Sequence, residues 1–346
     1  MSAPSYRPGV LLESALPLAQ AYDVALLDLD GVCYAGKLPI DHAATGINAA
    51  REAGMRSMFV TNNASRTPAD VAAHLTELGM ETIPEQVMTA AQDVAQIMRE
   101  DLPAGATVFV VGTSALVEAV QEAGFEVVDS ADAQPQAVVQ GLDRNITWAT
   151  MSEALMAIDR GARFYASNLD STLPTERGMA IGNGSLVACV EHAAGVKAVA
   201  AGKPFPGIFS RALARAGGGS AVGVGDRLNT DVACAVAAGV PSLHVLTGVS
   251  DAVAVALAAP QERPSFLAQD LRGLSQPHPA VDVEGVSATC REAHASIAAD
   301  GTVLVGGQPL AAGSELAMDE YRAVVGAAWA AADQDHPLSL PAFSVR

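Results

Sequence analysis

The run of residues 24–34 constrains the fold more than any other stretch of this chain. It reads Val-Ala-Leu-Leu-Asp-Leu-Asp-Gly-Val-Cys-Tyr, so an apolar segment stops abruptly at Asp28 and Asp30. In a strand, side chains two positions apart project from one face, which predicts that both carboxylates meet at the carboxyl end of a buried strand. Two such anions repel each other unless a divalent cation or a metal-bound phosphate shares the site. A solvated acidic turn at Gly31 is the alternative interpretation.

Length and composition favour a two-domain α/β protein. The chain has 346 residues, enough for roughly two domains. Half of the residues are apolar but only 4% are aromatic, which favours alanine-rich helices packed on a sheet. The formal net charge of -18, without a cluster of Lys or Arg, argues against nucleic-acid binding. A small phosphorylated metabolite is not excluded, since a bound cation reverses the field within a site.

The cysteines and the apolar segments bear on metal content and location. Widely spaced single cysteines without nearby histidine ligands argue against zinc and favour reduced, mostly buried thiols; they are Cys33, Cys189, Cys234 and Cys290. No apolar run is long enough to cross a bilayer. We therefore expect a soluble, cytoplasmic protein without membrane insertion, and the sequence leaves homo-oligomerisation open.

Strand, loop and helix patterns alternate along most of the chain, which predicts a parallel sheet with ligand-binding loops at its carboxyl edge. One example is the apolar run 56–61 followed by the helix start Thr67-Pro68. Further strands are expected at 106–111, 125–128, 137–141, 163–166, 198–201, 220–225 and 240–246, and helices at 43–53, 69–78, 114–123, 148–160 and 186–194. Asn229 and Thr230 are expected to cap a helix ending at Ala238.

The tail after Ser275 has a different texture. Gln-Pro-His-Pro indicates a linker, and we expect beyond it a first helix, a hairpin at 303–310 and a long helix at 314–332. No residues of this tail suggest chemistry.

Four of the expected strands end in polar groups that complement one another. Each alone has an ordinary interpretation as a polar loop, a surface lysine or a helix cap. Together they supply what displacement of a phosphoryl group requires: a nucleophile, oxygen ligands for Mg²⁺, donors for the phosphate oxygens and an acid for the leaving group. These groups are Asp28 with Asp30, Thr61 with Asn62, Lys203, and Asp226 with Asp231.

These motifs resemble those of the haloacid dehalogenase superfamily of phosphotransferases over roughly residues 20–270. Asp28-Leu-Asp-Gly-Val is similar to the first motif, Thr61-Asn-Asn to the second, Lys203-Pro to the third, and Gly225-Asp-Arg-Leu-Asn-Thr-Asp to the fourth. The insertion resembles the C2-type α/β cap of class IIA, the branch of NagD-type and p-nitrophenylphosphatase-like enzymes. With its tail, the chain most resembles bacterial glycerol-3-phosphate phosphatases, which would place it in glycerophospholipid metabolism.

The resemblance implies a Rossmann-like parallel-sheet core at 1–85 and 199–274, a substrate-selecting cap at 86–198, and a small α+β C-terminal extension at 275–346. In the cap, Asp143, Arg144, Asn168 and Asp170 are the candidate substrate contacts. Two positions depart from the branch: Leu169 stands where proline is frequent, and Asn229 where aspartate is frequent, which puts the outer metal shell in question.

The resemblance also implies roles. Asp28 would be the nucleophile that carries an aspartyl-phosphate, and Asp30 the general acid and base. Asp28, the Asp30 carbonyl, Asp226 and Asp231 would bind Mg²⁺, and Thr61, Asn62 and Lys203 would hold phosphate.

We expect a Mg²⁺-dependent phosphatase for a small metabolite, glycerol 3-phosphate first among the candidates. Phosphoglycolate, pyridoxal phosphate and a nucleotide monophosphate are the alternative substrates. A phosphomutase, a carbon-halogen hydrolase and a non-catalytic phosphate-sensing module are weaker alternatives.

Overall fold

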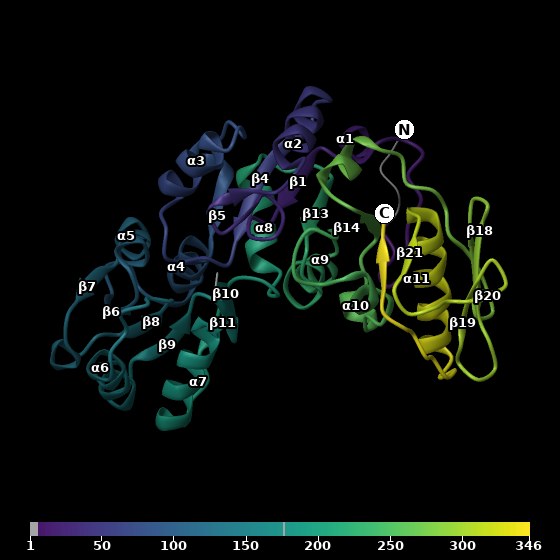
Figure 1. The fold of residues 1–346 in the computed structure, drawn as a ribbon. Coiled ribbons are helices and arrows are strands. Elements are labelled where there is room, and N and C mark those ends of the chain that lie inside the picture. The colour runs from purple at the N-terminus through teal and green to yellow at the C-terminus, as the bar shows by residue number, and fades with distance from the viewer. Residues whose placement is uncertain (1–5, 176) are drawn as a thin grey trace. The chain divides into compact units, whose positions relative to one another are not determined.

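The computed structural model describes residues 6–175 and 177–346 (Figure 1). The chain forms two compact units, one made of Met1–Met58 with Ala216–Arg346 and the other of Phe59–Arg215. The boundary near residue 58 falls inside a single strand, β4 (Arg56–Thr61). The cap boundaries at residues 86 and 198 stay a prediction.

The first unit contains a parallel sheet whose strands run in the order β15-β14-β13-β1. Every residue of these strands is buried, because both faces of the sheet are covered. The strands are β1 (Val24–Leu27), β13 (Ala221–Gly225), β14 (Ser242–Val245) and β15 (Phe266–Ala268). The helices of this part are α1 (Leu18–Ala21), α2 (Ala43–Glu52), α9 (Ala233–Ala238) and α10 (Ala252–Ala256), and β2 (Tyr34–Ala35) pairs with β3 (Leu38–Pro39).

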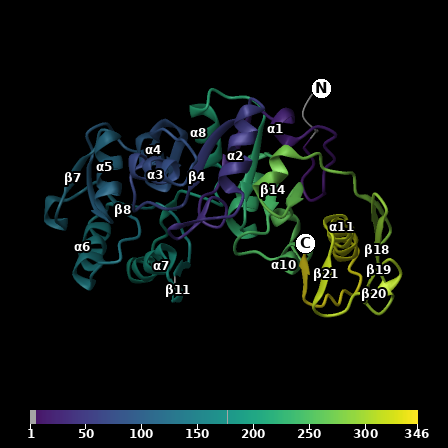
Figure 2. The ribbon, with the colours of Figure 1, turned by 45° about the horizontal axis from the view of Figure 1, so that its top comes forward.

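The C-terminal extension belongs to the same unit and is α+β, as expected. Its five antiparallel strands are β16 (Asp282–Glu284), β17 (Ser287–Cys290), β18 (Ala293–Ile297), β19 (Val303–Val305) and β20 (Gln308–Pro309). The long helix α11 (Met318–Asp333) packs mainly against β17 and β18. The strand β21 (Ser314–Leu316) precedes it and pairs with β22 (Phe343–Val345), which places the C-terminus beside β21 (Figure 2).

Two predictions for this extension were wrong. The first helix is absent from the described part of the extension, where β17 and β18 stand instead. Ala288, Cys290, Ala295 and Ile297 are buried with a period of two, which is the periodicity of a strand. The long helix begins at Met318 rather than residue 314, because residues 314–316 pair with β22. The hairpin at 303–310 is confirmed.

The extension shares a hydrophobic core with the parallel-sheet part of its unit. Trp329 of α11 packs in the same cluster as Val255 and Leu267, and its Nε1 donates to the Val255 carbonyl at 2.9 Å. Arg263 binds the Asp333 carboxylate of α11 through two hydrogen bonds of 2.7 and 2.8 Å. The linker predicted at Gln276 therefore does not separate two independent cores.

The second unit contains a five-stranded parallel sheet in the order β12-β9-β8-β6-β7. Its strands are β6 (Thr107–Val111), β7 (Glu126–Val128), β8 (Ala137–Gln140), β9 (Arg163–Ala166) and β12 (Val199–Ala200). The helices α5 (Ser114–Glu122), α6 (Trp148–Asp159) and α7 (Asn183–Ala194) follow the predicted order. Two apolar clusters pack in this unit.

The same unit holds the carboxyl half of β4 with its parallel partner β5 (Val87–Thr89). The helix α3 (Pro68–Glu77) starts at the predicted cap, where Thr67 and Asp70 form a reciprocal capping box. The sequence patterns did not predict β5, α4 (Ala90–Asp101), α8 (Gly207–Arg215) or the hairpin of β10 (Thr172–Thr175) and β11 (Gly178–Ile181). Among residues 6–175 and 177–346, no helix combines the length and apolarity that a membrane span requires.

Candidate active site

Three carboxylates gather at the carboxyl ends of β1 and β13. Asp28 follows β1 directly, Asp226 follows β13, and Asp231 lies in the π-helical turn Leu228–Val232. One oxygen from each lies within 4.8 Å of the others, and all three residues are buried. Buried carboxylates this close together are costly unless a cation shares them, and three hard oxygen donors suit Mg²⁺. The structure therefore places together three of the four residues predicted as metal ligands.

Asp226 is held rigidly by backbone groups. It is 0% exposed, its Oδ2 accepts from Val249 N at 2.6 Å, and its carbonyl accepts from Ser250 N at 3.1 Å. The His244 Nε2 lies 3.1 Å from the same carbonyl, and burial lowers the pKa of His244 to about 4, so this imidazole is neutral and donates. Neither His244 nor Val249 was predicted as a site residue, although both stand in or just after the predicted strand 240–246.

Two glycines make room for the Asp226 carboxylate. A Cβ on Gly31 or on Gly248 would clash with the Asp226 side chain, and Gly31 also has a φ of +86°. The Gly31 carbonyl accepts from Thr247 Oγ1 at 2.6 Å, which ties the turn after Asp30 to the loop after β14. The glycine of the opening motif thus allows close approach of a carboxylate as well as a turn.

Asp231 lies inside a helical turn that begins earlier in the chain than the sequence pattern predicts. The helical turn starts at Leu228 with Arg227 as N-cap, so Asn229 and Thr230 lie inside the turn instead of capping it. Asp231 also lies inside the turn, and its Oδ2 accepts from the backbone N–H of the N-cap residue Arg227 at 3.1 Å. The prediction that Asn229 and Thr230 cap this helix was therefore wrong.

Asp28 and Asp30 differ in environment. Asp28 is buried and its N–H donates to the Val224 carbonyl at 2.9 Å, extending the pairing of β1 with β13. Asp30 is exposed, and it pairs with Tyr34 in an isolated bridge. Burial, and then the charges of Asp28 and Asp30, raise the pKa of Cys33, whose thiol donates to the Asp28 carbonyl at 3.4 Å.

The second unit brings together the three residues predicted to hold phosphate. Asn62 Oδ1 accepts from Lys203 N at 2.7 Å, and Asn62 Nδ2 donates to the Lys203 carbonyl at 2.9 Å. The Lys203 ammonium donates to the Val60 carbonyl at 3.0 Å, and Thr61 is buried at the end of β4. The Asn62 amide thus fixes the backbone that carries Lys203.

An ion pair between Asp93 and Arg211 holds the backbone at Gly202, the residue before Lys203. Asp93 of α4 accepts from Gly202 N at 2.8 Å through Oδ2, and its Oδ1 pairs with Arg211 Nη1 at 2.9 Å. Burial raises the pKa of Asp93, which the Gly202 N–H and the Arg211 charge oppose. Neither Asp93 nor Arg211 was predicted as a site residue, because nothing in their spacing connects them with Lys203.

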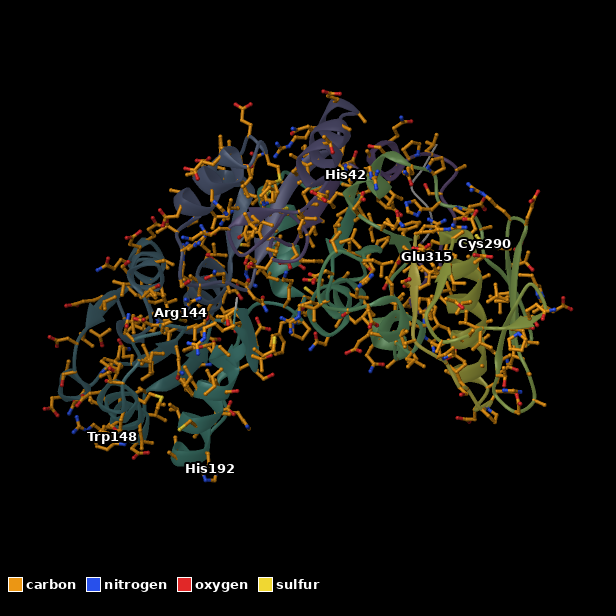
Figure 3. All side chains as sticks on the ribbon, in the orientation of Figure 1. His42, Arg144, Trp148, His192, Cys290 and Glu315 are labelled. Carbon is orange, nitrogen blue, oxygen red and sulfur yellow. The ribbon has the colours of Figure 1, made fainter. Side chains whose placement is uncertain are left out.

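The four predicted cap residues fall into two groups. Asn168 donates to the Asn62 carbonyl at 2.8 Å, and Asp170 accepts from Asn62 Nδ2 at 3.2 and 3.3 Å, so these two hold the loop after β4. Asp143 makes a local turn by accepting from Asn145 N at 2.8 Å, and Arg144 is exposed (Figure 3). Of the four, only Arg144 projects an exposed charged group from the end of β8.

Comparisons with known proteins agree with this geometry. Residues 25–126 match the family model described as haloacid dehalogenase-like hydrolase, and residues 200–274 match the one described as HAD-hydrolase-like. The chain is 45% identical over 259 residues to the D-glycerol 3-phosphate phosphatase of Mycobacterium tuberculosis, covering 75% of this chain and 72% of that protein. It is 35% identical over 231 residues to the acid sugar phosphatase of Staphylococcus epidermidis, covering 66% and 88%.

Solved structures give the same picture. The crystal structure of glycerol phosphate phosphatase from Mycobacterium tuberculosis in complex with magnesium is similar with a TM-score of 0.80 at 38% identity, covering 97% of this chain and 96% of that one. A thermostable NPPase from Geobacillus stearothermophilus is similar with a TM-score of 0.66 at 34% identity, and it covers 72% of this chain and 97% of its own.

Proposed function

Because the chain belongs to the haloacid dehalogenase-like hydrolases and is a phosphoric monoester hydrolase, we propose that it hydrolyses glycerol 3-phosphate through an aspartyl-phosphate on Asp28. The observation that carries this proposal is the buried group of Asp28, Asp226 and Asp231. Three buried carboxylates can hold a metal ion that assists phosphoryl transfer, whereas in a purely structural role their mutual repulsion would destabilise the fold.

In the proposed reaction, the Asp28 carboxylate attacks the phosphorus, and the bond from phosphorus to the ester oxygen breaks. Asp30 gives a proton to the departing oxygen and then takes one from the water that hydrolyses the aspartyl-phosphate. The burial of Asp28 and the exposure of Asp30 support this division, because a proton carrier needs access to water and a nucleophile does not.

The three carboxylates fit Mg²⁺, since each offers a hard oxygen within 4.8 Å of the others. Asp28, Asp226 and Asp231 would hold the ion, with the Asp30 carbonyl as a further ligand. A bound Mg²⁺ would neutralise charge on the phosphate oxygens.

Thr61 and Lys203 are proposed to bind the phosphate oxygens. Thr61 supplies a hydroxyl and Lys203 a cation, which together offset the charge that develops during transfer. The Asn62 side chain already bonds to Lys203 and Asp170, so its proposed contribution is to position Lys203.

Glycerol 3-phosphate is proposed as the substrate because a relative at 45% identity carries that activity in its name. Phosphoglycolate, pyridoxal phosphate and nucleotide monophosphates are the competing substrates. Arg144 is proposed to help choose among them, since an exposed arginine can bind a carboxylate or a second phosphate. A cytoplasmic location stays a prediction.

The test is phosphate release from each of these esters by the purified chain, with Mg²⁺ and with excess EDTA. We expect the highest kcat/KM for glycerol 3-phosphate and no turnover in EDTA. Asp28→Asn should abolish turnover on every ester, whereas Asp143→Asn, in a turn of the second unit, should retain it. Turnover that survives EDTA would contradict the metal-dependent reaction. A preference for another ester would overturn only the proposal that glycerol 3-phosphate is the substrate.

A further inference from the structure

We propose that a cavity between the C-terminal extension and the parallel-sheet part of the first unit binds a small phosphate-bearing anion. This cavity, the Arg322 pocket, has a volume of about 370 Å³ and is lined by residues that include Gln276, Arg291, Asp319 and Arg322. An adjoining cavity of about 190 Å³ shares Gln276 and Arg322 with it and adds Asp270 and Arg272.

Two guanidinium groups line the Arg322 pocket, and a third, that of Arg272, lines the adjoining cavity. Arg322 is only 9% exposed, and it donates to Asp319 Oδ1 at 2.7 Å and to the Leu267 carbonyl at 3.0 Å. The Arg291 side chain is 61% exposed and donates to Asp319 Oδ2 at 3.1 Å. The Arg322 pocket therefore has a fixed cation at its base and a second one at its rim. The Arg322 pocket can be located in Figure 3 by the labelled residue Cys290, whose thiol lies 3.7 Å from Asp319 Oδ1.

The charges around the pocket favour an anion. Arg272, Arg291 and Arg322 face two carboxylates, Asp270 and Asp319, which leaves one positive charge in excess in a chain whose net charge is -18. Ala317 and Met318, at the start of α11, also line the pocket, and the Ala317 N–H donates to Glu320 Oε2 at 2.8 Å. A locally positive electrostatic potential on an otherwise strongly acidic protein attracts anions from solution.

Hydrogen-bonding capacity points to phosphate. Each guanidinium has five donors and no acceptor, and the two carboxylates engage only some of them. The planar fork of arginine matches the oxygens of a phosphate group with two parallel bonds. A volume of about 370 Å³ lies near the lower end of small-molecule sites, so it suits free phosphate or a small phosphate ester.

The pocket depends on the C-terminal extension. Arg291, Asp319 and Arg322 come from the extension, whereas Asp270 and Arg272 follow β15. The NPPase neighbour covers only 72% of this chain, in contrast to the 97% covered by the glycerol phosphate phosphatase structure. The proposal thus gives the extension a ligand-binding role apart from the proposed reaction.

The experiment counts phosphate sites by equilibrium dialysis of radioactive inorganic phosphate against the full-length chain. Three variants are compared with wild type: Arg291→Gln, Arg272→Gln and the control Arg160→Gln. Arg160 is also a half-exposed arginine in an ion pair, with Asp132 at 2.9 Å, but it lies in the other unit. Arg291 and Arg272 have exposed side chains, so both variants should fold, as circular dichroism would verify.

We expect wild type and Arg160→Gln to bind one phosphate more than Arg291→Gln does. The affinity of this additional site should fall at least about tenfold in each pocket variant, since a charge-assisted hydrogen bond is lost. Phosphate at the catalytic residues would bind equally in all of these proteins, so the difference between them reports the Arg322 pocket alone.

Equal binding by wild type and Arg291→Gln would overturn the proposal, and the arginines would then serve only to dock α11. Competition with a non-hydrolysable phosphonate analogue of glycerol 3-phosphate, measured as the difference between wild type and Arg291→Gln, distinguishes the two ligands at the Arg322 pocket. Displacement at lower concentration than by phosphate itself assigns a phosphate ester, and the reverse assigns free phosphate.

Discussion

The Asn62 side chain brackets the backbone of Lys203, accepting from its N–H at 2.7 Å and donating to its carbonyl at 2.9 Å. The two residues are separated by 141 positions in the chain. An asparagine that follows a strand therefore sets the position of a lysine far away in the sequence.

Asn62→Ala should lower kcat/KM for every phosphate ester by about tenfold or more. Each lost hydrogen bond is worth roughly 1 kcal/mol, and the Lys203 peptide would lose two of them. Steady-state kinetics measures the effect, with Asn145→Ala as control because Asn145 is exposed. Unchanged kcat/KM in Asn62→Ala would mean that Lys203 is held by its other contacts.

Trp329→Ala should lower the free energy of unfolding by about 3–5 kcal/mol, the usual cost of removing a large buried side chain. Trp329 is 4% exposed and bonds to the Val255 carbonyl, whereas the second tryptophan, Trp148, is 80% exposed. Urea unfolding of Trp329→Ala and Trp148→Ala compares them directly. A similarly small decrease in the free energy of unfolding in both variants would show that the extension does not share the hydrophobic core of its unit.

Acid should destabilise the chain through His278. This ring is buried, its Nε2 lies 3.0 Å from the Gly273 carbonyl, and burial lowers its pKa to about 4. Since the unfolded chain keeps a pKa near 6.5, it binds the proton more readily, and stability falls as pH drops from about 6.5 to 4. The loss from this group amounts to up to about 3 kcal/mol.

The test measures unfolding free energy against pH for His278→Gln and for His294→Gln, whose histidine is exposed. The slope between pH 6.5 and 4 should flatten in His278→Gln and stay as in wild type in His294→Gln. Slopes are compared because the His278 substitution also changes stability at neutral pH. A slope that is unaltered in both variants would contradict the conclusion that protonation of His278 destabilises the chain in acid.

Local patterns in the sequence predicted most of the parallel-sheet elements. The apolar run 24–27, the strand at Arg56–Thr61 and the cap at Thr67 are each determined by neighbours in the chain, and the structure has them where expected. Parallel strands place their carboxyl ends at one edge of the sheet, and this rule predicted that Asp28, Asp226 and Asp231 lie close together.

What the sequence did not reveal depends on distant contacts. The bond from Asp93 to Gly202 N and the packing of His244 on the Asp226 carbonyl join residues whose spacing has no period. In the extension, the alanine-rich run 287–297 has no strong propensity, and pairing between β17 and β18 decides its conformation.

The division of roles between Asp28 and Asp30 is the central claim, and Asp30→Asn tests it most directly. General acid catalysis is worth roughly 10² to 10⁴ in rate, and it matters most for a poor leaving group such as glycerol. Asp30→Asn should nearly stop hydrolysis of glycerol 3-phosphate, whereas p-nitrophenyl phosphate should still phosphorylate Asp28.

The decisive measurement is rapid-quench release of p-nitrophenol by Asp30→Asn, with Asp28→Asn as the control that gives no release. We expect a burst close to one p-nitrophenol per chain followed by slow turnover, because the base that activates water is missing and the aspartyl-phosphate persists. Equal slowing of both esters, with no burst and no phosphoenzyme to trap, would contradict the account.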